Sequence, residues 1–336
     1  MGIPIGLFGR NNGVIMNERK TYLSLARVIG AWAVVIIHTN ICFPEFNVDR
    51  CWFWGNVLET SFGFAVPMFI MVSGATLIDY SLRYSTKEYF QKRILKTLIP
   101  YFVWSFIANL LHVNVFLIYY FFINLFGVYL CIPLFTFIKE TYKEKVIKYV
   151  IFASFILNYL LPFMCKIINI EYAFVIPFEV AGGYLIYALI GYLICKKDIS
   201  HKWRCLSYTC SLIGYLLYVG GTHLYSIQAG NLDYTFRGYT NLPCLLTSVG
   251  IFVLIKEIGQ KINNESMIKA IEWLSEYSFP VYLIHFLVIK LLIENVFGMY
   301  KHTVAYILGT PFITIAISIG IAWIIRKIPV VRKILP

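Results

Sequence analysis

The segment TYLSLARVIGAWAVVIIHTNIC, residues 21–42, is an apolar run that is long enough to cross a lipid bilayer as a helix. Comparable runs recur along the whole chain, with short polar segments between them. Unpaired backbone groups are too costly in hydrocarbon, and the runs are too long and too uniformly apolar for the strands of a membrane barrel. The sequence therefore predicts an all-α fold, a polytopic bundle of membrane helices.

The composition excludes a protein whose main solvent is water. Of the 336 residues, 59% are hydrophobic and only 14% are charged, whereas about a quarter of the residues of a soluble domain are charged. The net charge of +12 does not indicate nucleic-acid binding, because the basic residues fall in clusters between apolar runs rather than in one patch. Their distribution instead predicts how the chain is oriented across the bilayer.

Ten membrane spans are predicted from the apolar runs. They cover residues 21–42, 60–80, 98–113, 115–138, 146–165, 173–195, 205–223, 242–256, 277–296 and 303–325. The third and fourth spans are separated only by His112, Val113 and Asn114, and a single helix there would move every later loop across the membrane. We expect one membrane domain, residues 21–325, between a cytoplasmic N-terminal segment, residues 1–20, and a basic cytoplasmic tail, residues 326–336.

The positive-inside rule supports ten spans, because Lys and Arg next to membrane segments are retained in the cytoplasm. With a cytoplasmic N-terminus, the outer side receives only Arg50, Lys166, Arg237 and Lys301. All other basic residues fall on the cytoplasmic side or within spans, and merging two spans would spoil this asymmetry. Both termini are therefore expected in the cytoplasm.

The eight cysteines do not indicate a metal or redox site, since they form no CxxC pair and lie mostly within or beside apolar runs. Cys42 and Cys51 could form a disulfide if their loop faces an oxidising compartment, and unpaired thiols are an equal alternative. The chain has no GxSxG motif and no metal-ligating cluster in its sequence. We therefore predict neither a bound metal nor a covalent serine route.

Arg27 and His38 are ionisable side chains of the first span, where a charge is costly unless it is paired or hydrated. Their spacing, close to three helical turns, places them on one helix face and about 16 Å apart. A neutral imidazole can remove the proton of an acceptor hydroxyl, and a guanidinium can bind carbonyl or phosphate oxygens. The alternative is that Arg27 snorkels to the interface and His38 bonds a neighbouring carbonyl.

Four segments, in this order along the chain, resemble motifs of the bacterial acyltransferase 3 family of membrane proteins. RVIGAWAVVIIH (27–38) resembles the Arg-x10-His signature, and VPMFIMVSG (66–74) resembles the second-helix motif. KRILKTLIPYFVW (92–104) is similar to the basic loop that leads into a Pro-marked helix, and YSFPVYLIHFLVI (277–289) is similar to the penultimate-helix motif. No single motif would suffice, but four in order are specific, and the resemblance covers nearly the entire chain.

The resemblance implies roles for residues on the donor side. His38 matches the catalytic His of the family, and Arg27 matches an Arg that interacts with the acyl donor. Arg93 and Lys96 are placed near the phosphates of acyl-CoA, although ordinary positive-inside charge explains Lys96 equally well. Ser73, with Gly74, matches a recurrent Ser-Gly pair; Ser73 is a donor-side candidate, but we interpret the pair mainly as close helix packing.

The acceptor side is where the chain departs from the family pattern. Many relatives carry a His-Leu-Trp-like motif at the fourth helix, whereas residues 116–130 read FLIYYFFINLFGVYL. Tyr119, Tyr120 and Asn124 are candidate substitutes, and an interfacial aromatic belt would also explain the tyrosines. His285 matches the penultimate-helix motif, with a structural hydrogen bond as the preferred interpretation. Glu179, near the outer start of the sixth span, is a candidate contact because carboxylates commonly hold carbohydrate.

The resemblance predicts a multi-pass O-acyltransferase of the bacterial cytoplasmic (inner) membrane. It would move an acyl group, expected to be acetyl with succinyl as the alternative, from cytoplasmic acyl-CoA to a sugar hydroxyl of a lipid-linked or cell-surface glycan. Acyl-CoA is the expected cosubstrate, and no bound cofactor, metal or nucleic-acid partner is expected. A secondary transporter remains an alternative, although no inverted repeat is visible. A non-catalytic binding or translocating relative is a second alternative, because the fourth-helix motif is missing.

Overall fold

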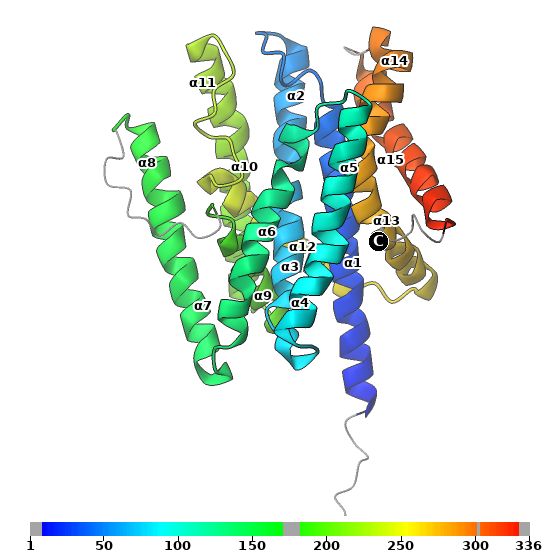
Figure 1. Ribbon diagram of the computed structural model, residues 1–336. Helices are drawn as coiled ribbons and strands as arrows, with labels where there is room; N and C mark the ends of the chain where they lie inside the picture. The colour runs from blue at the N-terminus through cyan, green and yellow to red at the C-terminus, as the bar shows by residue number, and fades with distance from the viewer. Residues whose placement is uncertain (1–8, 171–181, 301–302, 329–336) are drawn as a thin grey trace, which may run out of the picture.

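The computed structural model describes residues 9–170, 182–300 and 303–328. Over these residues the protein is a bundle of helices without a strand. Figure 1 shows α7 and α8 at one edge of the bundle and α13 and α15 at the other, with α1, α3, α5 and α6 between them. The all-α fold predicted from the apolar runs is confirmed.

The first part of the chain supplies the front and one edge of the bundle (Figure 1). Its elements are α1 (Gly9–Thr39), α2 (Arg50–Ser61), α3 (Ala65–Leu77), η1 (Tyr80–Leu82), α4 (Thr86–Arg93), η2 (Ile94–Leu98), α5 (Ile99–Leu110), α6 (Phe116–Thr136), α7 (Glu140–Ser154), η3 (Phe155–Leu160) and α8 (Leu161–Ile167). The turns η2 and η3 are π-helical and connect the α-helices on either side of them into longer helices.

The second part of the chain completes the bundle. Its elements are α9 (Leu185–Lys196), α10 (His201–Leu216), η4 (Leu217–Gly221), α11 (Thr222–Ala229), α12 (Leu242–Gln260), α13 (Glu265–Val288), η5 (Ile289–Ile293), α14 (Glu294–Phe297), η6 (Gly298–Tyr300) and α15 (Val304–Arg326). The helix α1 packs against α3, α12, α13 and α15, so the first predicted span lies at the centre of the fold.

Seven helices among the described residues are long and apolar enough to cross a membrane. They overlap the predicted spans 21–42, 60–80, 115–138, 146–165, 242–256, 277–296 and 303–325. The other three predicted spans correspond to α5, to α9, whose predicted start lies outside the described residues, and to α10 with η4 and α11. The third and fourth spans are separate helices, because the chain turns through His112 at φ 55°. The count of ten and the cytoplasmic position of both termini stay predictions.

The helix starts follow from polar residues in the loops. Asp49 accepts a hydrogen bond from the Trp52 N–H at the start of α2, at 2.7 Å. Asn264 caps α13 and Thr303 caps α15 in the same way. These side chains satisfy backbone N–H groups that have no partner within the helix.

Prolines inside the helices leave carbonyl groups that side chains from other helices bind. A proline has no N–H, so the carbonyl four residues before it loses its helical partner. Pro133 frees the Tyr129 carbonyl, which accepts a hydrogen bond from the Tyr89 hydroxyl at 2.9 Å. Pro280 frees the carbonyl of Glu276, which accepts one from Arg326 at 2.8 Å. Each bond joins elements far apart in the sequence.

Glycines allow α3 and α9 to touch at their backbones. A Cβ atom built on Gly74 would overlap the carbonyl group of Ala188, and one built on Gly191 would overlap the backbone of Met71. Small residues permit this close approach, which increases van der Waals contact between membrane helices. The packing role predicted for the Ser73–Gly74 pair therefore fits Gly74, while Ser73 faces elsewhere, as described below.

We expect Gly74→Ala to destabilise the protein, because the added methyl group meets the backbone of α9 rather than a movable side chain. Overpacking of this kind costs about 1–3 kcal/mol. The thermal unfolding temperature of the purified protein in detergent should fall by several degrees. Gly320→Ala is the matched control, since a Cβ at that position of α15 meets no atom within 4 Å. Equal unfolding temperatures for the two variants would contradict the packing account.

Candidate functional site

A cavity of about 740 Å³ opens among α1, α3, α4, α6, α13 and the end of α15, and we call it the basic cavity. It is lined by Arg27, Phe69, Val72, Ser73, Thr76, Leu77, Arg93, Lys96, Thr97, Phe121, Leu125, Tyr129, Ser275, Glu276, Ser278, Phe279, Tyr282 and Arg326. Its volume lies within the usual range for sites of small molecules and cofactors. All four residues predicted on the donor side, Arg27, Ser73, Arg93 and Lys96, lie in this one cavity.

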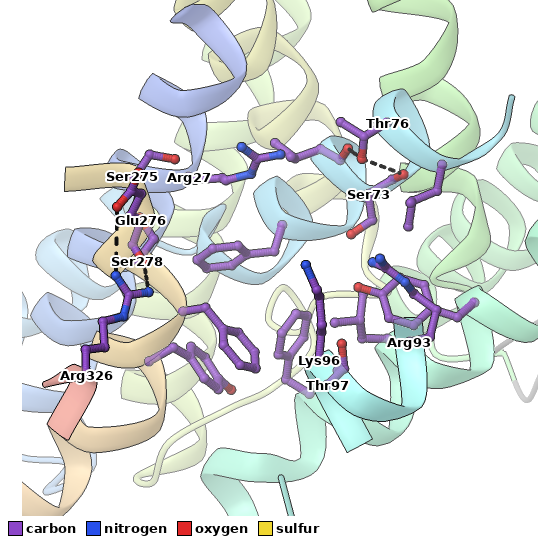
Figure 2. Close-up of a pocket in the computed structure, with 18 residues that line it drawn as sticks. Arg27, Ser73, Thr76, Arg93, Lys96, Thr97, Ser275, Glu276, Ser278 and Arg326 are labelled. Carbon is purple, nitrogen blue, oxygen red and sulfur yellow. Dashed lines mark hydrogen bonds and ion pairs between the residues drawn. The ribbon is translucent and has the colours of Figure 1, made fainter. Parts of the chain in front are cut away.

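The basic cavity has a strong positive charge. Figure 2 shows Arg27, Arg93 and Lys96 entering it from different elements, with Arg326 at another side. Glu276 is the only acidic residue among the described lining residues, and its carboxylate lies 3.9 Å from the Arg326 guanidinium. A cavity with four cations and one paired carboxylate favours an anion that carries several charges.

The π-helical turn η2 determines where the basic side chains of this segment point. It inserts one wide turn directly after Arg93, and Lys96 and Thr97 lie within it. Such turns are frequent at functional sites because they change the direction of side chains on a continuous helix. The Arg93 guanidinium lies 5.5 Å from the ring centre of Tyr129, whose face favours the cation. The segment thus presents two cations and one hydroxyl to the same cavity.

Arg326 is a lining residue that sequence reasoning assigned only to the basic tail. Its guanidinium donates to the Glu276 carbonyl at 2.8 Å and lies 4.7 Å from the centre of the Tyr277 ring. The signal that could have found it is Pro280, because this proline leaves the Glu276 carbonyl in need of a donor. Arg326 is therefore held at the cavity by α13.

A second and much smaller cavity, of about 40 Å³, contains His38, and we call it the His38 cavity. It is lined by Val34, Ile37, His38, Val66, Ile118, Tyr120, Phe121, Asn124, Tyr184, Tyr239 and Tyr282. Tyr120 and Asn124, which were predicted on the acceptor side, therefore lie next to the predicted base. Tyr120 is about half exposed, at 48%, so this wall is accessible from outside the protein core.

The hydrogen bonds of two histidines determine where the protons of His38 are. His285 is fully buried, and its Nδ1 lies 2.8 Å from the carbonyl oxygen of Tyr282. A carbonyl only accepts, so this Nδ1 carries the hydrogen and the Nε2 of the neutral ring is an acceptor. The Nδ1 of His38 lies 2.7 Å from that Nε2 and must donate to it. The Nε2 of His38 then keeps its lone pair.

Two tyrosines fix α6 to α13 at the level of the histidines. The hydroxyl of Tyr119 donates to the Leu283 carbonyl at 2.6 Å, and the hydroxyl of Tyr282 donates to the Ile118 carbonyl at 2.7 Å. Each helix thus supplies one donor and one acceptor, one residue apart. In this way α6 positions α13 and His285 without the His-Leu-Trp-like motif that its sequence lacks. Tyr119 acts as a packing residue here, away from the cavity lining.

An ion pair anchors one wall of the His38 cavity. Arg237, in the loop before α12, lies 2.6 Å from the Glu59 carboxylate on α2, and Asn40 also donates to this carboxylate at 3.1 Å. Burial alone would lower the pKa of Arg237, but neighbouring Tyr218 and Glu59 raise it above its ordinary value. The pair holds the loop that carries Tyr239 into the cavity. Neither Glu59 nor this pairing was predicted.

Two of the residues predicted on the acceptor side, Glu179 and His285, are not among the described lining residues of either cavity. Glu179 lies outside the described residues, so its predicted acceptor contact stays a prediction. His285 contacts His38 directly, as a hydrogen-bond partner rather than as part of a cavity wall.

Cys42 and Cys51 carry free thiols and line a common cavity of about 250 Å³ in the loop after α1.

The comparison with known proteins gives one family. A sequence model described as an acyltransferase domain, that of acyltransferase family 3, matches residues 20–326. No curated protein and no solved structure matches the chain. The matched range includes every described residue of both cavities.

We expect Arg237→Met to destabilise the protein more than the double variant Glu59→Gln/Arg237→Met. The single substitution leaves a buried carboxylate without its cation, which costs about 3–5 kcal/mol, whereas the double variant removes both charges. Thermal unfolding of the three proteins in detergent would measure the difference. A double variant that is less stable than Arg237→Met would show that the unpaired carboxylate is not the cause.

Proposed function

Because the match extends over nearly its whole length, the chain belongs to the acyltransferase 3 family, and we propose that it is a membrane O-acyltransferase that uses cytoplasmic acyl-CoA. The acceptor would be a sugar hydroxyl on a lipid-linked or cell-surface glycan, and the location the bacterial cytoplasmic membrane. The observation that carries this proposal is the arrangement along α1. Arg27 lines the basic cavity, and His38, on the same helix face about 16 Å away, lines the second cavity.

The basic cavity suits the donor. Coenzyme A carries several phosphate charges, and guanidinium and ammonium groups bind phosphate through charge-assisted hydrogen bonds. We assign the phosphates to Arg93 and Lys96, and the thioester or pantetheine portion to Arg27, which shares the helix α1 with His38. Ser73 adds a hydroxyl on the α3 wall, between Arg27 and Arg93 (Figure 2). The cavity would then open toward the cytoplasm.

The His38 cavity suits the transfer step. The Nε2 of His38, with its lone pair, accepts the proton of the acceptor hydroxyl as its oxygen attacks the thioester carbonyl carbon. The new C–O bond forms, the C–S bond breaks, and the coenzyme A thiolate leaves and takes the proton from His38. The base is thus regenerated. His285 acts as a positioning residue, because its Nε2 fixes the proton of His38 on Nδ1.

The acceptor would enter by the exposed side of this cavity. Tyr120 offers a half-exposed aromatic ring, and Asn124 offers an amide that can donate to and accept from sugar hydroxyls. The amide nitrogen of Asn124 already donates to the Tyr120 carbonyl at 3.3 Å, which leaves the amide oxygen for a ligand. We propose Glu179 as a further acceptor contact.

We expect His38→Ala to lower kcat for acyl transfer by about 10²–10⁴-fold, the usual contribution of a general base. His285→Leu should lower kcat without a comparable change in KM for acyl-CoA, because it removes the acceptor that fixes the tautomer. Transfer is followed as release of free thiol by the purified protein in lipid, with mixed surface glycans as acceptors.

His285→Gln is the matched control for this test. Its amide oxygen can accept from the Nδ1–H of His38, so it should recover part of the activity that His285→Leu loses. Full activity in His285→Leu would contradict the positioning role, and an active His38→Ala would contradict the proposed base. Absence of thiol release with wild type, for both acetyl-CoA and succinyl-CoA, would contradict the enzyme assignment.

We expect the double variant Arg93→Gln/Lys96→Gln to bind coenzyme A at least about ten-fold more weakly, since each charged hydrogen bond contributes about 1.5–3 kcal/mol. Lys87→Gln is the matched control, because Lys87 is exposed on the same helix α4 and lines neither cavity. Binding is measured by calorimetry with coenzyme A at two salt concentrations. An equal loss in the control would mean that general surface charge, rather than the cavity, attracts the donor.

A further inference from the structure

Three aromatic rings separate the basic cavity from the His38 cavity. Phe121 and Tyr282 line both cavities, so they form the wall between them. Their ring centres are 5.4 Å apart, and the ring of Phe69 lies 6.0 Å from Phe121 and 6.2 Å from Tyr282. The three rings come from α3, α6 and α13 and contact one another. We call this set the aromatic partition.

The partition lies against α1 between Arg27 and His38. A Cβ atom built on Gly30 would lie 3.3 Å from the ring of Phe69, so this ring lies directly on the α1 backbone. Gly30 is about one turn after Arg27, and Val34, one turn further, already lines the His38 cavity. The rings therefore close the path between the two cavities along the helix face that carries both residues.

Hydrogen bonds couple the partition to the histidine pair. The hydroxyl of Tyr282 is fixed by the Ile118 carbonyl at 2.7 Å, and the backbone carbonyl of Tyr282 accepts from the Nδ1 of His285 at 2.8 Å. Tyr282 thus belongs both to the wall and to the network that orients His38. The bond to the Ile118 carbonyl fixes the ring of Tyr282 in place. The ring of Phe121 has no hydroxyl that could fix it in this way.

The space beyond the partition is small and has no cation. The His38 cavity measures about 40 Å³, enough for a group of very few heavy atoms, since one water needs about 10–15 Å³ on this scale. Among the described residues that line it there is no Lys or Arg. An acetyl group has three heavy atoms and no charge, whereas a succinyl group is longer and ends in a carboxylate. Burying that carboxylate without a cation would be unfavourable.

We infer that the aromatic partition selects short, uncharged acyl groups, with acetyl favoured over succinyl, and that Phe121 sets the limit of size. This inference rests on the proposed function and adds to it the class of donor. The thioester reaches His38 when the ring of Phe121 moves aside, and it retreats as coenzyme A thiol after transfer. The rings take no part in bond making or breaking; they determine which acyl group can be presented to the base.

The test compares acetyl-, propionyl-, butyryl- and succinyl-CoA as donors for wild type, Phe121→Ala and Phe121→Leu, with thiol release and product mass as readouts. Wild type should use acetyl-CoA at least ten-fold better, in kcat/KM, than butyryl- or succinyl-CoA. Phe121→Ala should raise the ratio of kcat/KM for butyryl-CoA to kcat/KM for acetyl-CoA by at least ten-fold. Phe121→Leu should raise the same ratio by a smaller factor. Phe121→Leu also provides the test if the alanine variant does not fold.

Phe126→Ala is the matched control, because Phe126 lies on the same helix, is half-buried and lines neither cavity. It should keep the donor profile of wild type. The role of the partition in donor selection would be overturned by equal use of acetyl- and succinyl-CoA by wild type. It would also be overturned if both Phe121 variants kept the donor profile of wild type. Either result would leave the acyltransferase proposal intact. Absence of transfer from every donor by folded wild type would overturn the acyltransferase proposal itself.

Discussion

In a hydrocarbon environment a backbone carbonyl without a partner is costly, and the structure meets this constraint with side chains that also build its cavities. Arg326, at the basic cavity, donates to the carbonyl that Pro280 frees. Tyr89, whose ring lies near the Arg93 guanidinium, donates to the carbonyl that Pro133 frees. Tyrosine hydroxyls also donate to the carbonyls of Ile118 and Leu283, which no proline frees, and these bonds fix α6 to α13. The need to satisfy the freed carbonyls thus holds Arg326 at the basic cavity and joins Tyr89 to α6.

The central position of α1 explains how one helix can serve two sites. It packs against α3, α12, α13 and α15, and one of its faces presents Arg27, Gly30, Val34 and His38 in succession. Arg27 belongs to the basic cavity, Gly30 receives a ring of the partition, and the other two residues line the second cavity. Because the helix is regular, the separation of Arg27 and His38 is fixed by the number of residues between them.

Much of this could be predicted from the sequence, because helix periodicity and membrane hydropathy act locally. The apolar runs gave the helices, and the motif order gave Arg27, Ser73, Arg93 and Lys96, which share one cavity. Arg326, Phe121 and Tyr282 were not assigned, because their roles depend on which helices become neighbours. The pairing of Glu59 with Arg237 was not predicted either, because it joins residues across a long sequence separation. Local patterns do not determine such contacts.

Were the His38 cavity to open on the side of the membrane opposite the cytoplasmic basic cavity, the aromatic partition would also be the shortest barrier between the two sides. Water in the two cavities would extend the potential of the bulk solution into the protein. Most of the transmembrane potential would then fall across the rings of Phe69, Phe121 and Tyr282. A charge that crosses the full potential changes its energy by about 2.3 kcal/mol per 100 mV. A neutral acetyl group would pass this layer without electrical work, whereas an anionic acyl group would be driven with or against the field. The membrane potential itself would then contribute to the choice of donor.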